Sequence, residues 1–480
     1  MKFLQVDSFY GSYIDGIYAS HSDLARQPFS RQVKVLLDGG FSIAHNFAIM
    51  MDRLGYESTF IVGNALRAQS AWLEENRSRI ASLPRTLPEV FLSQIDLIQP
   101  DILHVGDTDT FDARLLKKTR WKPRLTLGWR AAPIAASADF SVFDVVLSSH
   151  SGCRERGLAL GAAAAEPFSP GLPRSYSQFA IDEPKVYDVV FAGQIGPLHR
   201  KRIEYLERLV AMPEVRTGAI RLGLFLAGTI PETLRPHALP PVFGNDFYRV
   251  LRQGRIALNV HIDMTGDEIQ NMRMFEVLTM GTFLLTDYGP NLDALFRLRH
   301  EIESFCSPAE MVDKIRYYLA NPSVREGIAR CGQERCLNEH SMEERIVWLD
   351  QIIRCHLDRK EVKTVGSVEV SPIGCSGVGE APAPVIGLQC NDFGLLMQQA
   401  EFLFGQAKFS DSITWFAAAA SLAPDFPDVH FKWGKALSAM NCYREALSRY
   451  RMALSLGGEN PELKSEIARM LSGMNAAVHA

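Results

Sequence analysis

Four polar residues of the types that bind a nucleotide occur together in one short stretch of the sequence: Glu268, Asn271, Arg273 and Glu276. The guanidinium group of Arg273 has a planar arrangement of donors that fits phosphate oxygens. The carboxylate of Glu276 can accept hydrogen bonds from sugar hydroxyl groups. This combination predicts a binding site for a ligand that carries both phosphate and sugar.

The secondary structure expected around this stretch places the polar groups side by side. Residues 256–260 and 282–286 are short apolar runs, which suit parallel strands covered on both faces. Residues 271–280 carry apolar side chains at helical spacing, and Gly281 follows where a glycine usually ends a helix. The polar groups therefore lie at a helix N-terminus beside the carboxyl end of a strand, where open α/β sheets bind ligands.

The same stretch resembles a known family of enzymes. Glu268 and Glu276 are separated by seven residues, and Gly281 follows at the spacing of the E-x7-E motif of retaining glycosyltransferases with the GT-B fold. The runs Asn271-Met272-Arg273-x-Phe275-Glu276 and Gly281-x-Phe283-Leu284-Leu285-Thr286-Asp287 resemble more narrowly the group 1 branch that includes spore-maturation and spore-coat glycosyltransferases.

The resemblance implies a role for each matching residue. Glu276 is expected on the ribose of a nucleotide sugar, Arg273 on the diphosphate, and Asn271 within the same binding site. Glu268 is expected to face the sugar as a catalytic residue, although its local sequence differs from the E-G-F-G of the family. The resemblance favours retention of the anomeric configuration. Because cationic side chains can stabilise the departing diphosphate, no metal and no other cofactor is expected.

A second anion site is predicted where the second half of the chain begins. A strand-like run over residues 187–192 ends at Gly193, and a short loop leads to His199, Arg200 and Arg202 at the start of a helix. Backbone amides and cations converge there, and in the family this place resembles the F-x-G strand end and its following arginine, which Arg202 matches best. Basic residues at a helix start oppose the helix dipole, which favours a bound phosphate over a solvated surface.

A pair of glycines in the first half is a further candidate. A first strand over residues 3–6 is followed by a long stretch expected to be a loop, and then by Gly39 and Gly40 ahead of a helix predicted over residues 41–54. The pair resembles the N-terminal glycine loop whose amides approach the diphosphate in many GT-B enzymes, with an ordinary turn as the alternative. His45, on the predicted helix, is interpreted as a buried structural histidine.

Two strand ends supply the remaining candidates. His104 lies on the strand predicted over residues 101–105, which resembles the strand that carries a donor-side histidine in retaining GT-B enzymes; relatives tend to have this histidine two residues later, at the position of Gly106. Arg130 follows the strand predicted over residues 124–127, and it is expected to reach a phosphate or an acceptor, with an exposed arginine at the strand end as the alternative.

Asp107 and Asp109 form a D-x-D pattern, which holds a divalent metal in GT-A transferases. The pattern precedes a helix predicted over residues 110–117, so Thr108 or Asp109 is interpreted as its N-cap. A metal-dependent transferase that uses the two aspartates remains a rival hypothesis.

Length and composition limit the kind of protein that this chain can be. The 480 residues predict two to four domains, and a net charge of -4 gives no reason to expect nucleic acid as a partner. No apolar run is long enough for a transmembrane segment, and the first residues, MKFLQVDSF, do not have the pattern of a secretory signal. The eight scattered cysteines indicate reduced thiols. We expect a cytoplasmic protein.

The expected fold class is α/β, with two Rossmann-like domains (GT-B) and an all-α tail. Residues 1–170 form the acceptor-side domain, residues 171–360 the nucleotide-sugar domain, and residues 361–390 a linker rich in Gly, Ser, Pro and Ala. Residues 391–480 contain a repeat of 34 residues that resembles tetratricopeptide repeats, with a closing helix over residues 461–474. Such modules bind a peptide or associate with a copy of themselves.

The sequence therefore predicts a glycosyltransferase that moves a sugar from a UDP-, GDP- or dTDP-linked donor to an acceptor. The repeat tail recruits a protein acceptor or mediates self-association. The alternative is a non-catalytic protein that binds nucleotide sugars or serves as a scaffold.

Overall fold

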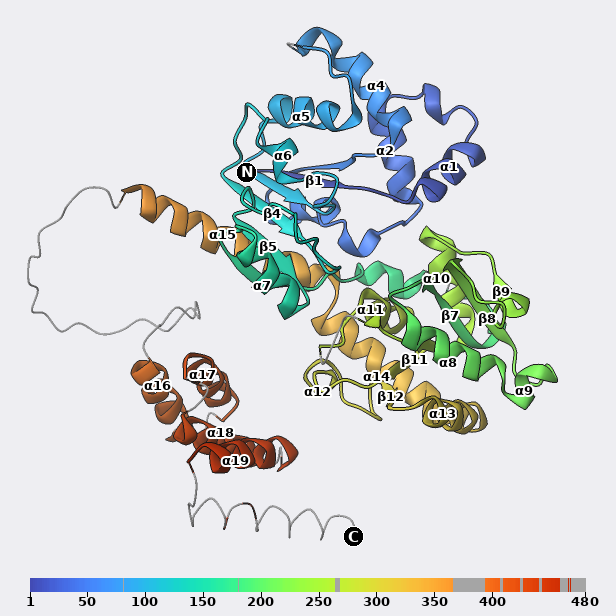
Figure 1. The fold of residues 1–480 in the computed structure, drawn as a ribbon, viewed down its shortest axis with the longest axis vertical. Coiled ribbons are helices and arrows are strands. Elements are labelled where there is room, and N and C mark those ends of the chain that lie inside the picture. Colours follow the sequence, from blue (N-terminus) through green and yellow to red (C-terminus); the bar gives the residue numbers. More distant parts are fainter. Residues whose placement is uncertain are drawn as a thin grey trace, which may run out of the picture. The chain divides into compact units, whose positions relative to one another are not determined.

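A computed structural model of the chain describes residues 1–80, 82–179, 181–263, 268–365, 393–405, 409–423, 426–439, 443–457, 465 and 467. The chain divides into two compact units, Met1–Val370 and Ser371–Ala480. The first unit contains two parallel sheets flanked by helices, and the second unit is helical (Figure 1).

The first sheet has six parallel strands in the order β2-β1-β3-β4-β5-β6. Its strands are β1 (Lys2–Asp7), β2 (Glu57–Val62), β3 (Ile102–Val105), β4 (Leu125–Trp129), β5 (Val145–Ser148) and β6 (Ala165–Pro167). Alternate side chains of one strand enter two different cores, so that Phe3 packs on one face and Leu4 on the other. Because both faces are covered, the strands are apolar runs without alternation.

The helices of this half of the unit follow the strands in the order expected for a parallel sheet. They are α1 (Gly11–Ser20), α2 (Phe29–Asp38), α3 (Ala48–Met51), α4 (Leu66–Asn76), α5 (Leu87–Ile98), α6 (Ala113–Leu116) and α7 (Ser151–Ala159), with 3-10 turns η1 (Leu24–Arg26), η2 (Ile43–His45), η3 (Asp52–Leu54) and η4 (Arg77–Arg79).

The second sheet also has six parallel strands, in the order β12-β11-β10-β7-β8-β9. Its strands are β7 (Tyr187–Ile195), β8 (Leu222–Gly228), β9 (Ala238–Leu239), β10 (Gly254–Asn259), β11 (Phe283–Asp287) and β12 (Glu303–Phe305). Val189 and Val190, neighbours on β7, again enter separate cores on the two faces. The predicted pair of parallel α/β sheets is therefore confirmed.

The helices that accompany the second sheet are α8 (Arg200–Val210), α9 (Pro213–Arg216), α10 (Gly244–Gln253), α11 (Met272–Thr279), α12 (Leu292–Leu295), α13 (Pro308–Ala320) and α14 (Pro322–Glu339), with η5 (Arg174–Gln178) and η6 (Arg235–His237). Helix α15 (Met342–Val365) then returns to the first sheet, where Ile346, Leu349 and Ile353 join its core. The last helix of the unit therefore packs against the first sheet, and one core holds both ends of the unit.

Three local predictions in the first half are wrong. The stretch expected as a loop after β1 contains α1 and α2, which pack Tyr13 and Leu36 into the core. The helix predicted over residues 41–54 is divided into η2, α3 and η3, and Ser42, with a left-handed φ of 54°, precedes the first of them. The helix predicted over residues 110–117 is the shorter α6, and its N-cap is Asp112 rather than Thr108 or Asp109.

The second unit contains α16 (Phe393–Gly405), α17 (Phe409–Leu422), α18 (Pro427–Ala439) and α19 (Tyr443–Gly457). The aromatic side chains that recur after 34 residues, Phe416 and Tyr450, are both buried, and a Cβ on Gly434 would lie 2.4 Å from the Tyr450 ring. Small residues therefore occupy the places where these helices touch. Of the predicted closing helix, only residues 465 and 467 are described, and residues 366–390 of the predicted linker lie outside the described part of the chain.

Among the described residues, no helix combines the length and the hydropathy needed to cross a membrane.

Candidate functional site

Two cavities open beside the carboxyl ends of the strands in the first unit. The larger has a volume of about 800 Å³, and the smaller has a volume of about 380 Å³. The larger cavity is lined from the first half of the unit by Gly40 and Phe41 and from the second half by Gly193, Arg273 and Glu276. Both halves therefore contribute walls to one concave site.

Arg273 and Glu276 form the charged end of the larger cavity. Nη1 of Arg273 donates to Oε2 of Glu276 at 2.8 Å, and its guanidinium group stacks 4.0 Å above the ring of Phe247. The hydroxyl of Tyr248 donates to the other carboxylate oxygen at 3.4 Å. Burial and the neighbouring Glu276 raise the pKa of Tyr248, which keeps this donor protonated. Each charged group is thus held in one orientation by a neighbour.

Helix α11 begins beside these residues because Asn271 caps it. The side-chain oxygen of Asn271 accepts from the backbone N–H of Met274 at 3.3 Å, while its amide donates to Asn259 at 3.0 Å. Gly281, with a left-handed φ of 64°, follows the helix end as predicted. The first helical turn is therefore tied to the carboxyl end of β10.

The smaller cavity is lined by residues from both halves of the unit. Among them are three of the predicted site residues, Arg130, Arg202 and Asn271, and three histidines, His45, His150 and His261. His45 lines both cavities, and burial lowers its pKa to about 4. These side chains give the smaller cavity a mixture of cationic groups and imidazoles.

Arg202 holds the loops at the edge of the smaller cavity. Its Nε and Nη2 donate to the carbonyl of Val260 at 3.0 and 2.7 Å, and its Nη1 donates to the carbonyl of Gln194 at 2.7 Å. Burial, together with the nearby Arg273, lowers its pKa to about 10. Because the guanidinium group is buried without a carboxylate among these three bonds, its positive charge is available to an anion in the adjoining cavity.

Arg130 and the D-x-D aspartates are engaged with one another and with the backbone. Nη1 of Arg130 lies 2.5 Å from Oδ2 of Asp109, and Nη2 donates to the carbonyl of Pro133 at 2.6 Å. Oδ1 of Asp107 accepts from the backbone N–H groups of Asp109 and Thr110. Among the described residues, no three His, Cys, Asp or Glu side chains are grouped as metal ligands.

Glu268 lies outside both cavities. Its Oε2 accepts from the backbone N–H of Ser151 at 2.7 Å, at the first residue of α7. Burial tends to raise the pKa of this carboxyl, but the bonds to Ser151 and the charge of Arg154 outweigh it and lower the pKa. The residue therefore connects the loop before α11 to a helix of the first half.

The two glycines of the first half have different surroundings. Gly40 lines the larger cavity at a φ of 76°, and a Cβ there would lie 2.2 Å from Oδ1 of Asn245. Gly39 lines neither cavity, and its carbonyl accepts from the backbone N–H of Asn245 at 2.8 Å. The glycine pair thus lets the first turn of α10 approach the first half closely.

The remaining predicted residues do not line either cavity. His104 is buried between Phe3 and Phe47, and burial with the neighbouring His45 lowers its pKa to about 3. His199 precedes α8, where burial and Arg202 lower its pKa. The backbone N–H of Arg200 donates to Asp263 at 2.9 Å, and its side chain is 90% exposed to solvent.

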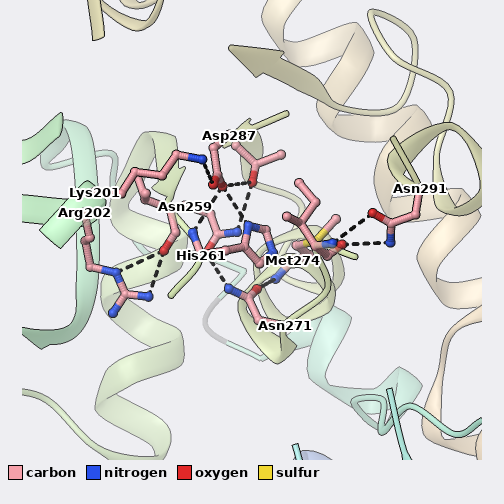
Figure 2. A network of polar contacts seen from close by, with 11 residues as sticks. Lys201, Arg202, Asn259, His261, Asn271, Met274, Asp287 and Asn291 are labelled. Carbon is pink, nitrogen blue, oxygen red and sulfur yellow. Dashed lines mark hydrogen bonds and ion pairs between the residues drawn. The ribbon is translucent and has the colours of Figure 1, made fainter. Parts of the chain in front are cut away.

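A pair of buried residues was not among the predicted ones. His261 lies two residues after the end of β10, and its Nδ1 is 2.7 Å from Oδ1 of Asp287 at the end of β11. Lys201 donates to Oδ2 of the same carboxylate at 2.8 Å (Figure 2). The sequence signal was a histidine placed just beyond a buried apolar strand. Its partner could not be read from the sequence, because it depends on which strands are neighbours.

Comparison with known proteins gives one family match. Residues 217–352 match a family described as glycosyl transferase-like. No curated protein sequence matches the chain.

Solved structures give more distant similarities. A glycosyltransferase from Rickettsia africae has a TM-score of 0.45 at 12% identity, over 74% of this chain and 98% of that one. HepE from Anabaena in complex with UDP and glucose has a TM-score of 0.44 at 10% identity, over 77% and 100%. Sucrose-phosphate synthase from Thermosynechococcus elongatus has a TM-score of 0.41 at 13% identity, over 57% and 77%.

The family match contains α11 with Arg273 and Glu276, and it confirms the expected enzyme class: the segment 217–352 is that of a glycosyltransferase.

Proposed function

We propose that the first unit transfers a sugar from a nucleotide sugar, and that the larger cavity binds the nucleotide. The observation that carries this proposal is the Arg273–Glu276 pair, which forms the charged end of an 800 Å³ cavity within the segment that matches glycosyl transferases. Arg273 bonds to the diphosphate, and Glu276 accepts from the ribose hydroxyls. The other residues of the cavity wall then select among the uracil, guanine and thymine bases.

The smaller cavity holds the transferred sugar and the group that receives it. Arg202 and His45 support this division, since Arg202 presents buried positive charge beside the smaller cavity and His45 is shared by both. Positive charge at this point stabilises the diphosphate as it leaves. The reaction therefore proceeds without a metal, and the E-x7-E resemblance favours a retained anomeric configuration.

A second candidate is a nucleotide-sugar-binding protein without turnover. The position of Glu268 favours it, because the carboxylate expected at the sugar is bonded to the N-terminus of α7 instead. A protein with this arrangement keeps the nucleotide cavity and lacks the expected carboxylate at the reacting centre.

We also propose that the second unit is a pair of tetratricopeptide repeats of the kind that binds polypeptides, and that the enzyme is related to the spore-coat branch. The burial of Phe416 on α17 and Tyr450 on α19, which are 34 residues apart, supports the repeats. A peptide-binding module favours a protein acceptor, or a second copy of the chain, over a small molecule.

Hydrolysis of UDP-, GDP- and dTDP-linked sugars, measured with and without EDTA, tests the proposed activity. We expect sugars linked to one of the three nucleotides to be hydrolysed, with release of the nucleoside diphosphate at the same rate with and without EDTA, because arginine side chains neutralise the leaving group. Binding without release in either condition identifies the second candidate. Activity that EDTA abolishes and manganese restores assigns the reaction to a metal held by Asp107 and Asp109.

A further inference from the structure

The pairing of His261 with Asp287 gives the imidazole ring a defined orientation. The backbone N–H and Nδ1 of His261 lie 3.1 and 2.7 Å from the same carboxylate oxygen of Asp287. Both side chains are only 1% exposed. Figure 2 shows the carboxylate between the imidazole ring and Lys201, which donates to its second oxygen.

The carboxylate also determines which ring nitrogen carries the proton. Burial tends to raise the pKa of Asp287, but the bonds and charges of His261 and Lys201 outweigh it and hold the pKa at about 2. An ionised carboxylate is only an acceptor, so Nδ1 must be the donor. In the neutral ring, Nε2 then has a free lone pair and can only accept.

This second ring nitrogen has no partner in the described part of the protein. Nε2 of His261 is buried and unbonded, whereas buried polar atoms normally have a hydrogen-bond partner. His261 lines the 380 Å³ cavity, so the missing partner is one that a ligand of this cavity can supply. An acceptor nitrogen requires a donor, and on a sugar or a sugar acceptor the donor is a hydroxyl group.

We propose that His261 is a substrate-binding residue whose Nε2 accepts a hydrogen bond from a hydroxyl group held in the smaller cavity. The proposal rests on the sugar transfer proposed above. The hydroxyl group belongs either to the donor sugar or to the acceptor. If the hydroxyl group is the attacking group of the acceptor, its oxygen forms the new bond to the sugar while its proton passes to Nε2 and the nucleoside diphosphate leaves. The imidazolium then returns the proton to water.

The two sources give different measurements with the His261→Gln variant. For a donor-sugar hydroxyl, the affinity for the nucleotide sugar falls by about 5- to 10-fold, while the affinity for the free nucleoside diphosphate is unchanged. For an acceptor hydroxyl, both affinities are kept, and the rate of donor hydrolysis by water falls by roughly 100-fold or more. Calorimetry and diphosphate release, with the donor that the wild type prefers, distinguish these results.

The pH profile separates a substrate contact from a structural effect. The charged and titratable groups near His261 are Asp287 on β11, Lys201 and Arg202 on α8, His150 before α7, Arg130 after β4 and His45 on η2. A proton on Nε2 would remove its acceptor lone pair, so the pH dependence of the hydrolysis rate, or of the donor affinity, is compared between the wild type and the variants. The His261→Gln variant loses this dependence, and the His150→Gln variant keeps it.

Two further variants test the role of His261 without changing the ring itself. Asp287→Asn replaces the ionised carboxylate that fixes the proton on Nδ1 with a neutral amide, so the neutral ring is free to carry its proton on Nε2; this variant should reproduce the defect of His261→Gln. Lys201→Met removes the other partner of the carboxylate and leaves the ring bond intact, and it should bind the donor as the wild type does. Thermal unfolding verifies that each variant is folded.

The results that would contradict a role for His261 differ from those that would contradict sugar transfer by the wild type. If the wild type turns over a nucleotide sugar while folded His261→Gln and Asp287→Asn variants match it in affinity, rate and pH profile, His261 contacts no substrate hydroxyl, and the proposed function stands. Loss of the acid dependence in His150→Gln alone assigns the role to His150. If the wild type binds no nucleotide sugar, the proposed function fails and this inference fails with it.

Discussion

At the scale of single residues, the site consists of charged groups whose neighbours fix their orientation. Arg273 is stacked on Phe247 and paired with Glu276, and His261 is paired with Asp287. Such pairs reduce the conformational freedom that a ligand would otherwise have to remove on binding. Because these groups are paired, the free energy of unfolding also depends on whether each of them is ionised.

The ionised Asp287 should therefore contribute stability that depends on pH. Its pKa of about 2 lies below the ordinary value of 3.8, so its contribution is present above pH 4 and is lost as the pH falls towards 2. Asp287→Asn should lower the free energy of unfolding at neutral pH by on the order of 2 kcal/mol, and the difference from the wild type should shrink in acid. Urea unfolding of both proteins across this pH range measures the difference in unfolding free energy.

A matched control is Asp313→Asn. The Asp313 carboxylate is 77% exposed and lies 3.6 Å from Arg316, so its loss should change the unfolding free energy little at any pH. A constant difference between Asp287→Asn and the wild type down to pH 2 would show that the carboxylate is not held ionised.

At the scale of elements, α11 was predictable because its signals are local. An asparagine cap, an apolar stripe and a C-terminal glycine all lie within the helix and its flanks, and the structure has α11 at Met272–Thr279. Such agreement between local signals and the fold is what makes an element recognisable from one sequence.

The first half of the unit was harder to predict because distant contacts decide it. The side chain of Gln5 on β1 donates to the carbonyl of His45 at 2.6 Å and accepts from the backbone N–H of Ala48 at 3.0 Å. These bonds occupy backbone groups that a continuous helix over residues 41–54 would need. The pairing of His261 with Asp287 likewise depends on the alignment of β10 with β11, which no local pattern reveals.

Glu268 gives a prediction about the attachment of α7. Glu268→Ala removes the carboxylate that accepts from Ser151 at the helix N-terminus, so it should lower the free energy of unfolding by about 1 kcal/mol. Because Glu268 lines neither cavity, the affinity for the nucleoside diphosphate should not change. Thermal unfolding and calorimetry on the same variant measure the two effects, and weaker nucleotide binding at unchanged stability would place the carboxylate at the ligand.

In the molecule as a whole, both cavities lie within the first unit, and the 34-residue sequence repeat lies within the second. Chain length and composition indicated several domains. The spacing of apolar residues and the 34-residue repeat indicated α/β domains and an all-α domain. The position of one unit relative to the other does not enter the chemistry proposed for the cavities.

Removal of residues 391–480 should therefore leave the hydrolysis of a nucleotide sugar unchanged within about twofold, because every residue assigned to the cavities remains. Transfer to the native acceptor should fall, since a tethered recruiting module raises the local concentration of its partner. Light scattering on both forms tests self-association. An unchanged mass together with a full rate of transfer would remove both roles from the tail.

The proposed function assigns nucleotide binding to Arg273 and Glu276. Calorimetric titration of UDP, GDP and dTDP into the wild type, Arg273→Ala and Glu276→Ala tests it most directly, with Arg208→Ala on the exposed face of α8 as the control. We predict that the wild type and the control bind one nucleotide equally well. Loss of one charged hydrogen bond should weaken binding in the other two variants by roughly 10- to 100-fold. Equal affinity in all four proteins would contradict the assignment of the nucleotide to the larger cavity.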